Sequence, residues 1–224
     1  MIRIDHQSTR KPPPLLSSEF ADVSRLALVD DDRFVAKIAP GQFYASARGE
    51  FLMTTLGSCV AACIRNPQTG IGGMNHFMLP DYWEGGSDWW ESTLVSSPAR
   101  YGNVAMERLI NVVLADRPTR SSLEIKVFGG AKVLRANIDI GERNITFVKS
   151  YLRTEGLTLD AQDLGGTSPR RLIYDSRSGE VFVRRLASLD QREEIVVEEL
   201  AHLNHLRQEP VSGDVDLFDA GDNS

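Results

Sequence analysis

A cysteine and a histidine, close in sequence, are the residues of this chain best suited to chemistry. Cys59 follows the short turn Leu56-Gly57-Ser58 and precedes a small, apolar segment. A thiol acts as a nucleophile in its thiolate form, which a neighbouring base or free backbone N–H donors can promote. His76 comes 17 residues later, after a glycine pair. A strand, a turn and a second strand would return His76 to the side of Cys59, so the spacing predicts a site for nucleophilic catalysis.

The same residues also have plainer interpretations. A cysteine in an apolar context is most often a buried residue that packs as a small hydrophobe, and a single histidine is most often a structural group. Cys63 lies in the apolar segment 60–64 and is the thiol we expect to be inert. A zinc site is not expected, because no second pair of Cys or His follows at ligand spacing. On one strand, Cys59 and Cys63 would share a face but lie too far apart for a disulfide bond.

Five short blocks of sequence, taken in order, resemble the chemoreceptor glutamine deamidase family CheD. The resemblance covers roughly residues 35–185, and each block alone is weak whereas five in order are specific. The blocks are LGSCV at 56–60, GMNHFMLP at 73–80, RYGN at 100–103 with AM at 105–106, FGGA at 128–131 and IGERN at 140–144. The resemblance implies a layered α/β/β sandwich.

The resemblance also assigns catalytic roles. Cys59 matches the catalytic cysteine of the family and His76 matches its histidine. The third catalytic residue of the family is a threonine a few positions before the cysteine. This chain has one residue fewer in that interval than some members, so the role is carried to Thr54, with Thr55 as the substitute. The backbone N–H groups of Cys59 and Ser58 are candidate donors to the oxyanion of a tetrahedral intermediate.

The implied activity is that of an amidohydrolase, a protein-glutamine glutaminase. It would convert glutamine side chains of chemoreceptors (methyl-accepting chemotaxis proteins) to glutamate and release ammonia, in chemotaxis adaptation. The substrate would be the helical cytoplasmic domain of the receptor, and the resemblance also implies possible binding to a CheC-type phosphatase. A non-catalytic adaptor that binds such a phosphatase or receptors is one alternative, and a redox or metal protein that uses both cysteines is another. No cofactor and no metal ion are expected.

Composition limits the remaining classes of function. The chain has 224 residues, 42% of them hydrophobic and 25% charged, which is enough to bury one core. Its 25 basic and 31 acidic residues give a net charge of −6, and no basic cluster with interleaved aromatic residues occurs, so nucleic acid is not an expected partner. No apolar run approaches the ~20 residues of a membrane span. We expect no membrane insertion and a cytoplasmic protein with reduced thiols.

The order of predicted elements favours a mixed sheet with two main helices, an α/β (α+β) domain. One helix is expected to begin at Ser97-Pro98 and a second near residue 141. The segment Gly129-Gly130-Ala131 lacks the spacing of a phosphate loop, so it is interpreted as close backbone packing near the site. Strands are expected at residues 34–38, 42–45, 51–56, 71–78, 123–128, 157–162, 171–175 and 180–184.

The ends of the chain lie outside the main domain, which is expected at residues 31–188. Residues 1–30 are predicted to be an irregular N-terminal extension, and residues 209–224, with five acidic and no basic residues, a disordered acidic tail. Residues 189–208 are predicted to form a C-terminal helix, on which His202 and His205 are interpreted as surface residues. Its apolar residues could dock on the core or on a partner: Ile195, Val196, Leu200, Leu203 and Leu206.

A loop rich in tryptophan interrupts the pattern at residues 81–97. All three tryptophans of the chain lie in it, among glycines and polar residues. It packs over a hydrophobic edge of the domain, or it is exposed and supplies anchors for a protein partner.

Overall fold

The described part of the chain folds into two β-sheets and three α-helices. The structure, a computed structural model, describes residues 2–79, 97–115, 120–133, 139–186 and 189–208. The Trp-rich loop and the acidic tail lie outside these residues. The helices are α1 (Ser97–Leu114), α2 (Ile140–Thr154) and α3 (Leu189–Gln208), and short 3-10 turns occur at Ser18–Phe20 and Arg120–Ser122.

The two sheets lie in successive layers. The six-stranded sheet has the order β1 (Ile4–Asp5), β2 (Ser24–Leu28), β3 (Phe34–Lys37), β5 (Phe51–Leu56), β10 (Arg170–Asp175) and β11 (Val181–Arg185). The five-stranded sheet has the order β4 (Phe43–Ser46), β7 (Ile71–Asn75), β6 (Val60–Asn66), β8 (Glu124–Gly129) and β9 (Ala161–Leu164). Each sheet contains one parallel pair, β3 with β5 and β8 with β9, among antiparallel ones.

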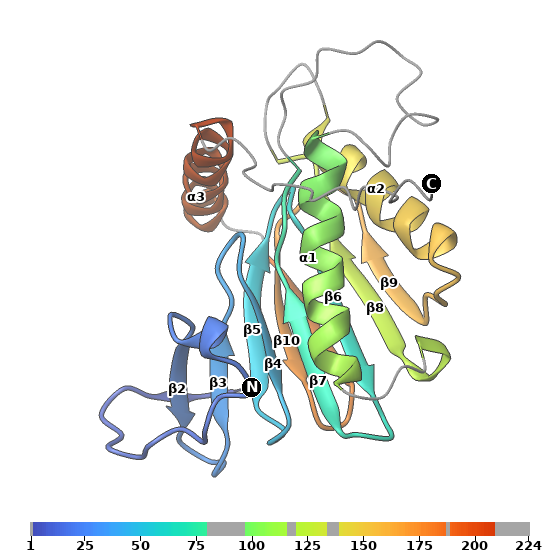
Figure 1. Ribbon diagram of the computed structural model, residues 1–224. Coiled ribbons are helices and arrows are strands. Elements are labelled where there is room, and N and C mark those ends of the chain that lie inside the picture. The colour runs from blue at the N-terminus through green and yellow to red at the C-terminus, as the bar shows by residue number, and fades with distance from the viewer. Residues whose placement is uncertain (1, 80–96, 116–119, 134–138, 187–188, 209–224) are drawn as a thin grey trace, which may run out of the picture.

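Helices cover one face of the five-stranded sheet, and the six-stranded sheet covers the other (Figure 1). One buried cluster joins the layers: it includes Leu52 and Leu172 from the six-stranded sheet, Ile64 from the five-stranded sheet and Leu109 from α1. The predicted α+β fold class with a mixed sheet is therefore confirmed.

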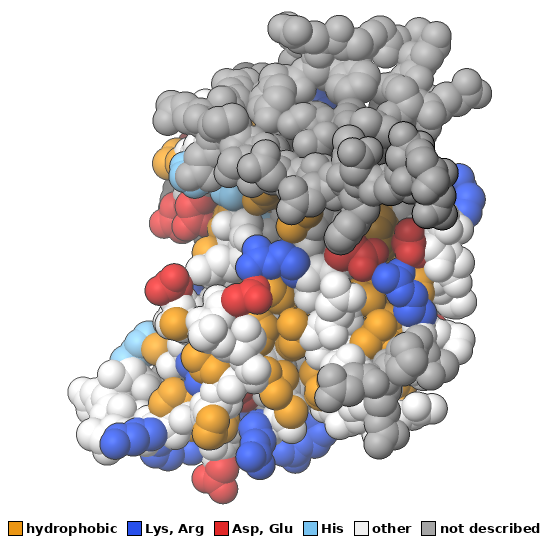
Figure 2. All heavy atoms as spheres, in the orientation of Figure 1, with side chains coloured by type: hydrophobic (Ala, Val, Ile, Leu, Met, Phe, Trp, Pro, Cys, Tyr) orange, Lys and Arg blue, Asp and Glu red, His pale blue; other side chains and the backbone are white. Residues whose placement is uncertain are grey.

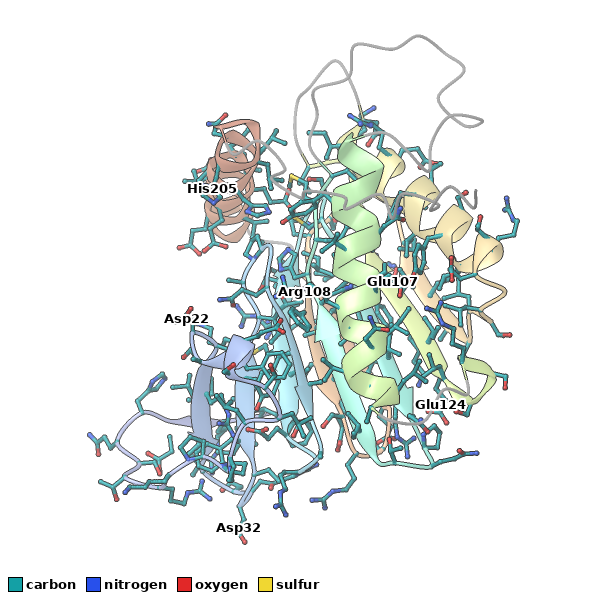
Figure 3. The ribbon with its side chains drawn as sticks, viewed as in Figure 1. Asp22, Asp32, Glu107, Arg108, Glu124 and His205 are labelled. Carbon is teal, nitrogen blue, oxygen red and sulfur yellow. The ribbon has the colours of Figure 1, made fainter. Side chains whose placement is uncertain are left out.

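The two covering helices form where apolar spacing and capping predict them. In α2 the Asp139 side chain caps the first turn by accepting a hydrogen bond from the Glu142 N–H at 3.1 Å, and Ile145, Val148 and Leu152 form its buried stripe. On α1, Glu107 faces α2 and accepts a hydrogen bond from the Tyr151 hydroxyl (Figure 3). A polar contact thus joins the two helices above the apolar layer.

The N-terminal segment differs from the irregular extension that the sequence predicts. β1 and β2 lie within it and extend the six-stranded sheet, with Leu26 of β2 opposite Val35 of β3. Phe20 is fully buried, and its ring contacts Phe43 with centroids 5.2 Å apart. Pairing with neighbouring strands, more than their own residues, makes these two segments strands.

The C-terminal helix forms over the residues predicted for it. Ile195, Leu203 and Leu206 are buried, whereas Leu200 is 44% exposed. Of the two docking sites that the sequence leaves open, α3 therefore uses the core of its own chain. It lies beside the end of β5, apart from α1 and α2 (Figure 1).

Candidate active site

The site is built around a three-residue loop, Gly57, Ser58 and Cys59, that carries the chain from one sheet to the other. β5 ends at Leu56 in the six-stranded sheet, and β6 begins at Val60 in the five-stranded one. We call these residues the 57–59 loop. All three of its carbonyl groups are fixed by hydrogen bonds on one side: Gly57 accepts from the Ala131 N–H at 2.7 Å, Ser58 from Asn144 Nδ2 at 2.8 Å, and Cys59 from the Gly130 N–H at 2.8 Å.

The glycines after β8 make this anchoring possible. Gly129 has φ +112°, and a Cβ atom added there would lie 2.2 Å from the Cys59 carbonyl oxygen. Only glycine has both the backbone freedom and the absence of a side chain that this approach requires. The predicted close backbone packing of Gly129-Gly130-Ala131 near the site is confirmed.

Backbone pairing brings His76 to the same end of the sheet as Cys59. β6 and β7 are antiparallel neighbours, and beyond their ladder Val60 and Phe77 exchange two hydrogen bonds, at 3.0 and 2.9 Å. Cys59 and His76 directly precede these two residues. In this register their side chains are diagonal neighbours on one face, a distance that long side chains can bridge.

Thr54 contacts the His76 ring across the gap between the sheets. Its Oγ1 lies 2.8 Å from His76 Nδ1 and 2.7 Å from the Ile38 carbonyl oxygen. A carbonyl can only accept, so the single hydroxyl hydrogen of Thr54 goes to Ile38 and the ring must donate Nδ1–H to Thr54. This assigns the tautomer of His76 and leaves its Nε2 unprotonated. Thr55, the substitute candidate, makes no such contact among the described residues.

His76 is a neutral group in a dry environment. It is 2% exposed, and burial, with the neighbouring His202 ring as the second cause, lowers the pKa of His76 to about 3. The ring is therefore uncharged near neutral pH. Among the described residues its Nε2 has no hydrogen-bond partner, so a free lone pair of a base lies in the site.

The thiol of Cys59 is not accessible from the surface. Cys59 is 0% exposed. Burial raises the pKa of the Cys59 thiol well above its usual value, and the nearby carboxylate of Glu199 raises it further. Cys63 is also buried, on β6 opposite Met74, and burial raises the pKa of its thiol too.

The residue that closes the site is Glu199 of α3, which sequence reasoning missed. Its Oε1 accepts from the N–H groups of Gly57 and Cys59, each at 3.0 Å. Its Oε2 accepts from the N–H and the Oγ of Ser58, at 2.9 and 2.7 Å. One signal was available: position 199 lies midway between the apolar positions 195 and 203, so a helix that buries Ile195 and Leu203 also buries a carboxylate.

His202 is the second α3 residue that belongs to the site. The sequence interpretation of His202 as a surface residue is wrong, because the ring is partly buried and packs over Gly41, where an added Cβ would lie 3.1 Å from its Cε1. Burial, followed by the neighbouring His205, lowers the pKa of His202 to about 4. His205 is exposed, as predicted, and marks the outer part of α3 in Figure 3.

A cavity of about 900 Å³ lies between α3 and the ends of β3 and β5. Thr54 and His76 line it from the sheets, and Glu194, Glu198 and His202 line it from α3. In Figure 2 acidic and histidine side chains gather over this helix. The cavity therefore extends to Thr54 and His76, whereas Cys59 is not among the residues that line it.

The described residues contain no group of three or more His, Cys, Asp or Glu side chains that could hold a metal ion. Within the same part of the chain, no helix is both long enough and apolar enough to span a membrane.

Comparison with known proteins relates this chain to one family. A family model described as CheD chemotactic sensory transduction matches residues 78–185. A protein of Hahella chejuensis named "Probable chemoreceptor glutamine deamidase CheD" is 45% identical over 217 residues, 95% of this chain and 98% of the relative. Proteins with the same name from Halorhodospira halophila and Herminiimonas arsenicoxydans are 48% and 47% identical, over 89% and 84% of this chain and 91% and 90% of the relatives. Similarity at this level over nearly its whole length means that the chain belongs to the CheD family.

Proposed function

We propose that this chain is a cysteine-dependent deamidase that converts glutamine side chains of chemoreceptors to glutamate and releases ammonia. The observation that carries the proposal is the convergence of three backbone N–H groups beside the Cys59 thiol. Amide hydrolysis needs a nucleophile, a base that can return a proton to the leaving nitrogen, and donors for the tetrahedral oxyanion. Cys59, His76 and the 57–59 loop supply one each.

In the first half of the reaction, His76 Nε2 takes the thiol proton and Cys59 Sγ attacks the side-chain carbonyl carbon of the substrate glutamine. The resulting oxyanion is held by the N–H groups of Gly57, Ser58 and Cys59. The imidazolium then gives its proton to the amide nitrogen, the C–N bond breaks and ammonia leaves. The acyl group remains on Cys59 as a thioester.

In the second half, His76 takes a proton from water, whose oxygen attacks the thioester. The C–S bond breaks, the thiol recovers the proton from His76, and glutamate is released. Thr54 is a positioning residue in this scheme, because its oxygen accepts Nδ1–H and so keeps the lone pair on Nε2. The same hydrogen bond becomes stronger when the ring is protonated, which stabilises the imidazolium.

The cellular setting follows from this function. A chemoreceptor substrate implies action in the cytoplasm, on the receptor domains that lie there, and a CheC-type phosphatase is a further proposed partner. A non-catalytic adaptor is the competing function. His76 is buried and neutral, and its Nε2 has no hydrogen-bond partner among the described residues. This favours the enzyme, because an adaptor has no need for an unpaired buried base.

The test is mass spectrometry of a receptor cytoplasmic fragment after incubation with the protein, because deamidation adds a fixed small mass at the modified residue. The proposal expects conversion by the unaltered chain, none by Cys59→Ala, and retained conversion by Cys63→Ala, the matched control. Conversion that survives Cys59→Ala would exclude the cysteine mechanism. A fragment that stays unmodified but binds the protein would favour the adaptor.

A further inference from the structure

The 57–59 loop already holds a ligand, which the chain itself supplies. Four donors of the loop converge on one carboxylate: the N–H groups of Gly57, Ser58 and Cys59 and the hydroxyl of Ser58, at 2.7–3.0 Å from Glu199. Glu199 is only 2% exposed. A Cβ atom at position 57 would lie 2.8 Å from both of its carboxylate oxygens, so the bare backbone of Gly57 is what lets the carboxylate approach.

The chemistry of the loop matches the product of the proposed reaction. Every group that the loop offers to Glu199 donates a hydrogen, so both oxygens of a carboxylate are satisfied there. An amide fits less well, because its nitrogen also donates and faces the Ser58 N–H. The product of glutamine deamidation is a glutamate side chain, which ends in the same carboxylate at the same distance from its backbone.

The position of Glu199 on its helix also resembles that of a substrate side chain. The carboxylate lies on a helix, and Ile195 and Leu203, one turn before and one turn after it, are buried on the same side. The Cys59 N–H donates to Glu199 Oε1 at 3.0 Å, so the carboxylate lies next to the residue that carries the nucleophile. His202, three residues later on the same helix, lines the same cavity as His76.

We propose that α3 is a built-in product mimic: it occupies the substrate site with Glu199 in the position of the product glutamate, and a glutamine-bearing helix of the substrate must displace it. This inference rests on the proposed function and deepens it. It assigns the binding mode of the substrate, a helix whose glutamine enters the 57–59 loop between apolar residues one turn to either side. It also makes the chain self-inhibited, because a helix tethered in the same chain has a local concentration on the order of millimolar.

The sharpest test uses Glu199→Gln in the full chain, because that substitution turns the mimic into a substrate. Cys59 Sγ would attack the side-chain amide carbon at position 199, and the proton taken from the thiol by His76 would leave with ammonia. Water would then cleave the thioester and regenerate the thiol, so that the encoded amide becomes a carboxylate. Peptide mass spectrometry of the purified variant reads this conversion directly, and the Cys59→Ala/Glu199→Gln double variant is its control.

The inference expects conversion at position 199 in the single variant and none in the double variant. Conversion should be first order and independent of protein concentration, since it takes place within one chain. If the variant deamidates a receptor fragment while position 199 keeps its amide, the inference is overturned and the proposed function stands. If the unaltered chain and the variant modify neither target, the proposed function fails and the inference with it.

A second measurement does not depend on self-conversion. Glu199→Ala removes the mimic and should raise the rate of receptor-fragment deamidation roughly tenfold, because the loop no longer has to release a carboxylate held by four donors. The matched control is Glu193→Ala, an exposed acidic residue on the same helix, which should leave the rate unchanged. An unchanged or lower rate in a folded Glu199→Ala protein, judged by its unfolding transition, would overturn the inference.

Discussion

Thr54 Oγ1 lies 2.8 Å from His76 Nδ1, and its hydrogen is already committed to the Ile38 carbonyl oxygen. These two contacts assign the tautomer of the histidine without any ligand in the site. They make Nε2 the basic nitrogen, and the proposed mechanism requires a base at that position. Thr54 and His76 come from different sheets, so the relative position of the two sheets determines the tautomer of the imidazole.

Thr54→Val tests this relationship. The substitution keeps the shape of the side chain but removes the oxygen that accepts Nδ1–H, so the ring can turn or change tautomer. We expect kcat to fall roughly tenfold to a hundredfold, equivalent to about 1.4–2.8 kcal/mol, with little change in KM. Thr55→Val is the matched control and should stay within about twofold. Steady-state ammonia release measures both, and a larger loss in Thr55→Val would move the role to that residue.

Asn144→Asp tests the anchoring of the 57–59 loop. Asn144 is fully buried, donates to the Ser58 carbonyl oxygen at 2.8 Å and accepts from the Leu79 N–H at 2.9 Å. A carboxylate of the same shape keeps the second contact but faces the Ser58 carbonyl with no hydrogen to donate. We expect the free energy of unfolding to fall by about 1–3 kcal/mol in chemical denaturation. Lys149→Gln, on the exposed side of α2, should change it by less than about 0.5 kcal/mol.

The reactivity of Cys59 should depend on Glu199. Burial and the carboxylate both raise the pKa of the thiol, whereas the nearby His76 and His202 are neutral near pH 7. Removing the carboxylate removes one of the two causes, so the pKa of Cys59 should fall in Glu199→Ala.

Alkylation by iodoacetamide across a pH series measures this change. The midpoint of the rate profile for Cys59 should move to lower pH in Glu199→Ala and stay in place in Glu193→Ala. Cys63, fully buried on β6, serves as the internal reference and should remain unlabelled in the folded protein. A midpoint that moves to higher pH would contradict the electrostatic role of Glu199.

Acid should destabilise the fold through two histidines. Burial holds the pKa of His76 at about 3 and that of His202 at about 4 in the folded protein, whereas an unfolded chain has histidines near 6.5. Below that value the unfolded state binds more protons, so this contribution to stability is complete above pH 6.5 and is lost as the pH falls toward 3–4. The slope reaches at most about 1.4 kcal/mol per pH unit for each histidine.

His202→Gln should make this pH dependence less steep. Urea denaturation at several values between pH 4 and 7 gives the slope, and His205→Gln, on the exposed part of the same helix, is the control (Figure 3). Equal slopes in the two variants would mean that His202 titrates normally and is not buried against the sheets.

Local pattern was sufficient to predict the backbone of the site. A strand, a turn and a strand between Cys59 and His76 form a local unit, and its antiparallel register follows from the 17-residue separation and the polar turn. The choice between Thr54 and Thr55 required the three-dimensional structure. Adjacent residues on a strand point to opposite faces, and only the contact with His76 identifies the inward one.

The position of Glu199 over the 57–59 loop could not be predicted from local sequence pattern. Glu199 lies 140 residues from Cys59, and their contact depends on how α3 docks, which is a property of the packed core and not of the helix sequence. The burial of the Cys59 thiol could not be predicted for the same reason. β1 and β2 were missed because their pairing partners, not their own residues, make them strands.

Hydroxylamine competition tests the central claim, a thioester on Cys59, most directly. Hydroxylamine attacks thioesters much more readily than amides, so turnover of a receptor fragment in its presence should place hydroxamate at the glutamine positions that otherwise become glutamate. The account predicts both products at the same residues for the unaltered chain, with the hydroxamate share rising with hydroxylamine concentration, and neither product for Cys59→Ala. Glutamate as the sole product at every hydroxylamine concentration, or either product from Cys59→Ala, would contradict it.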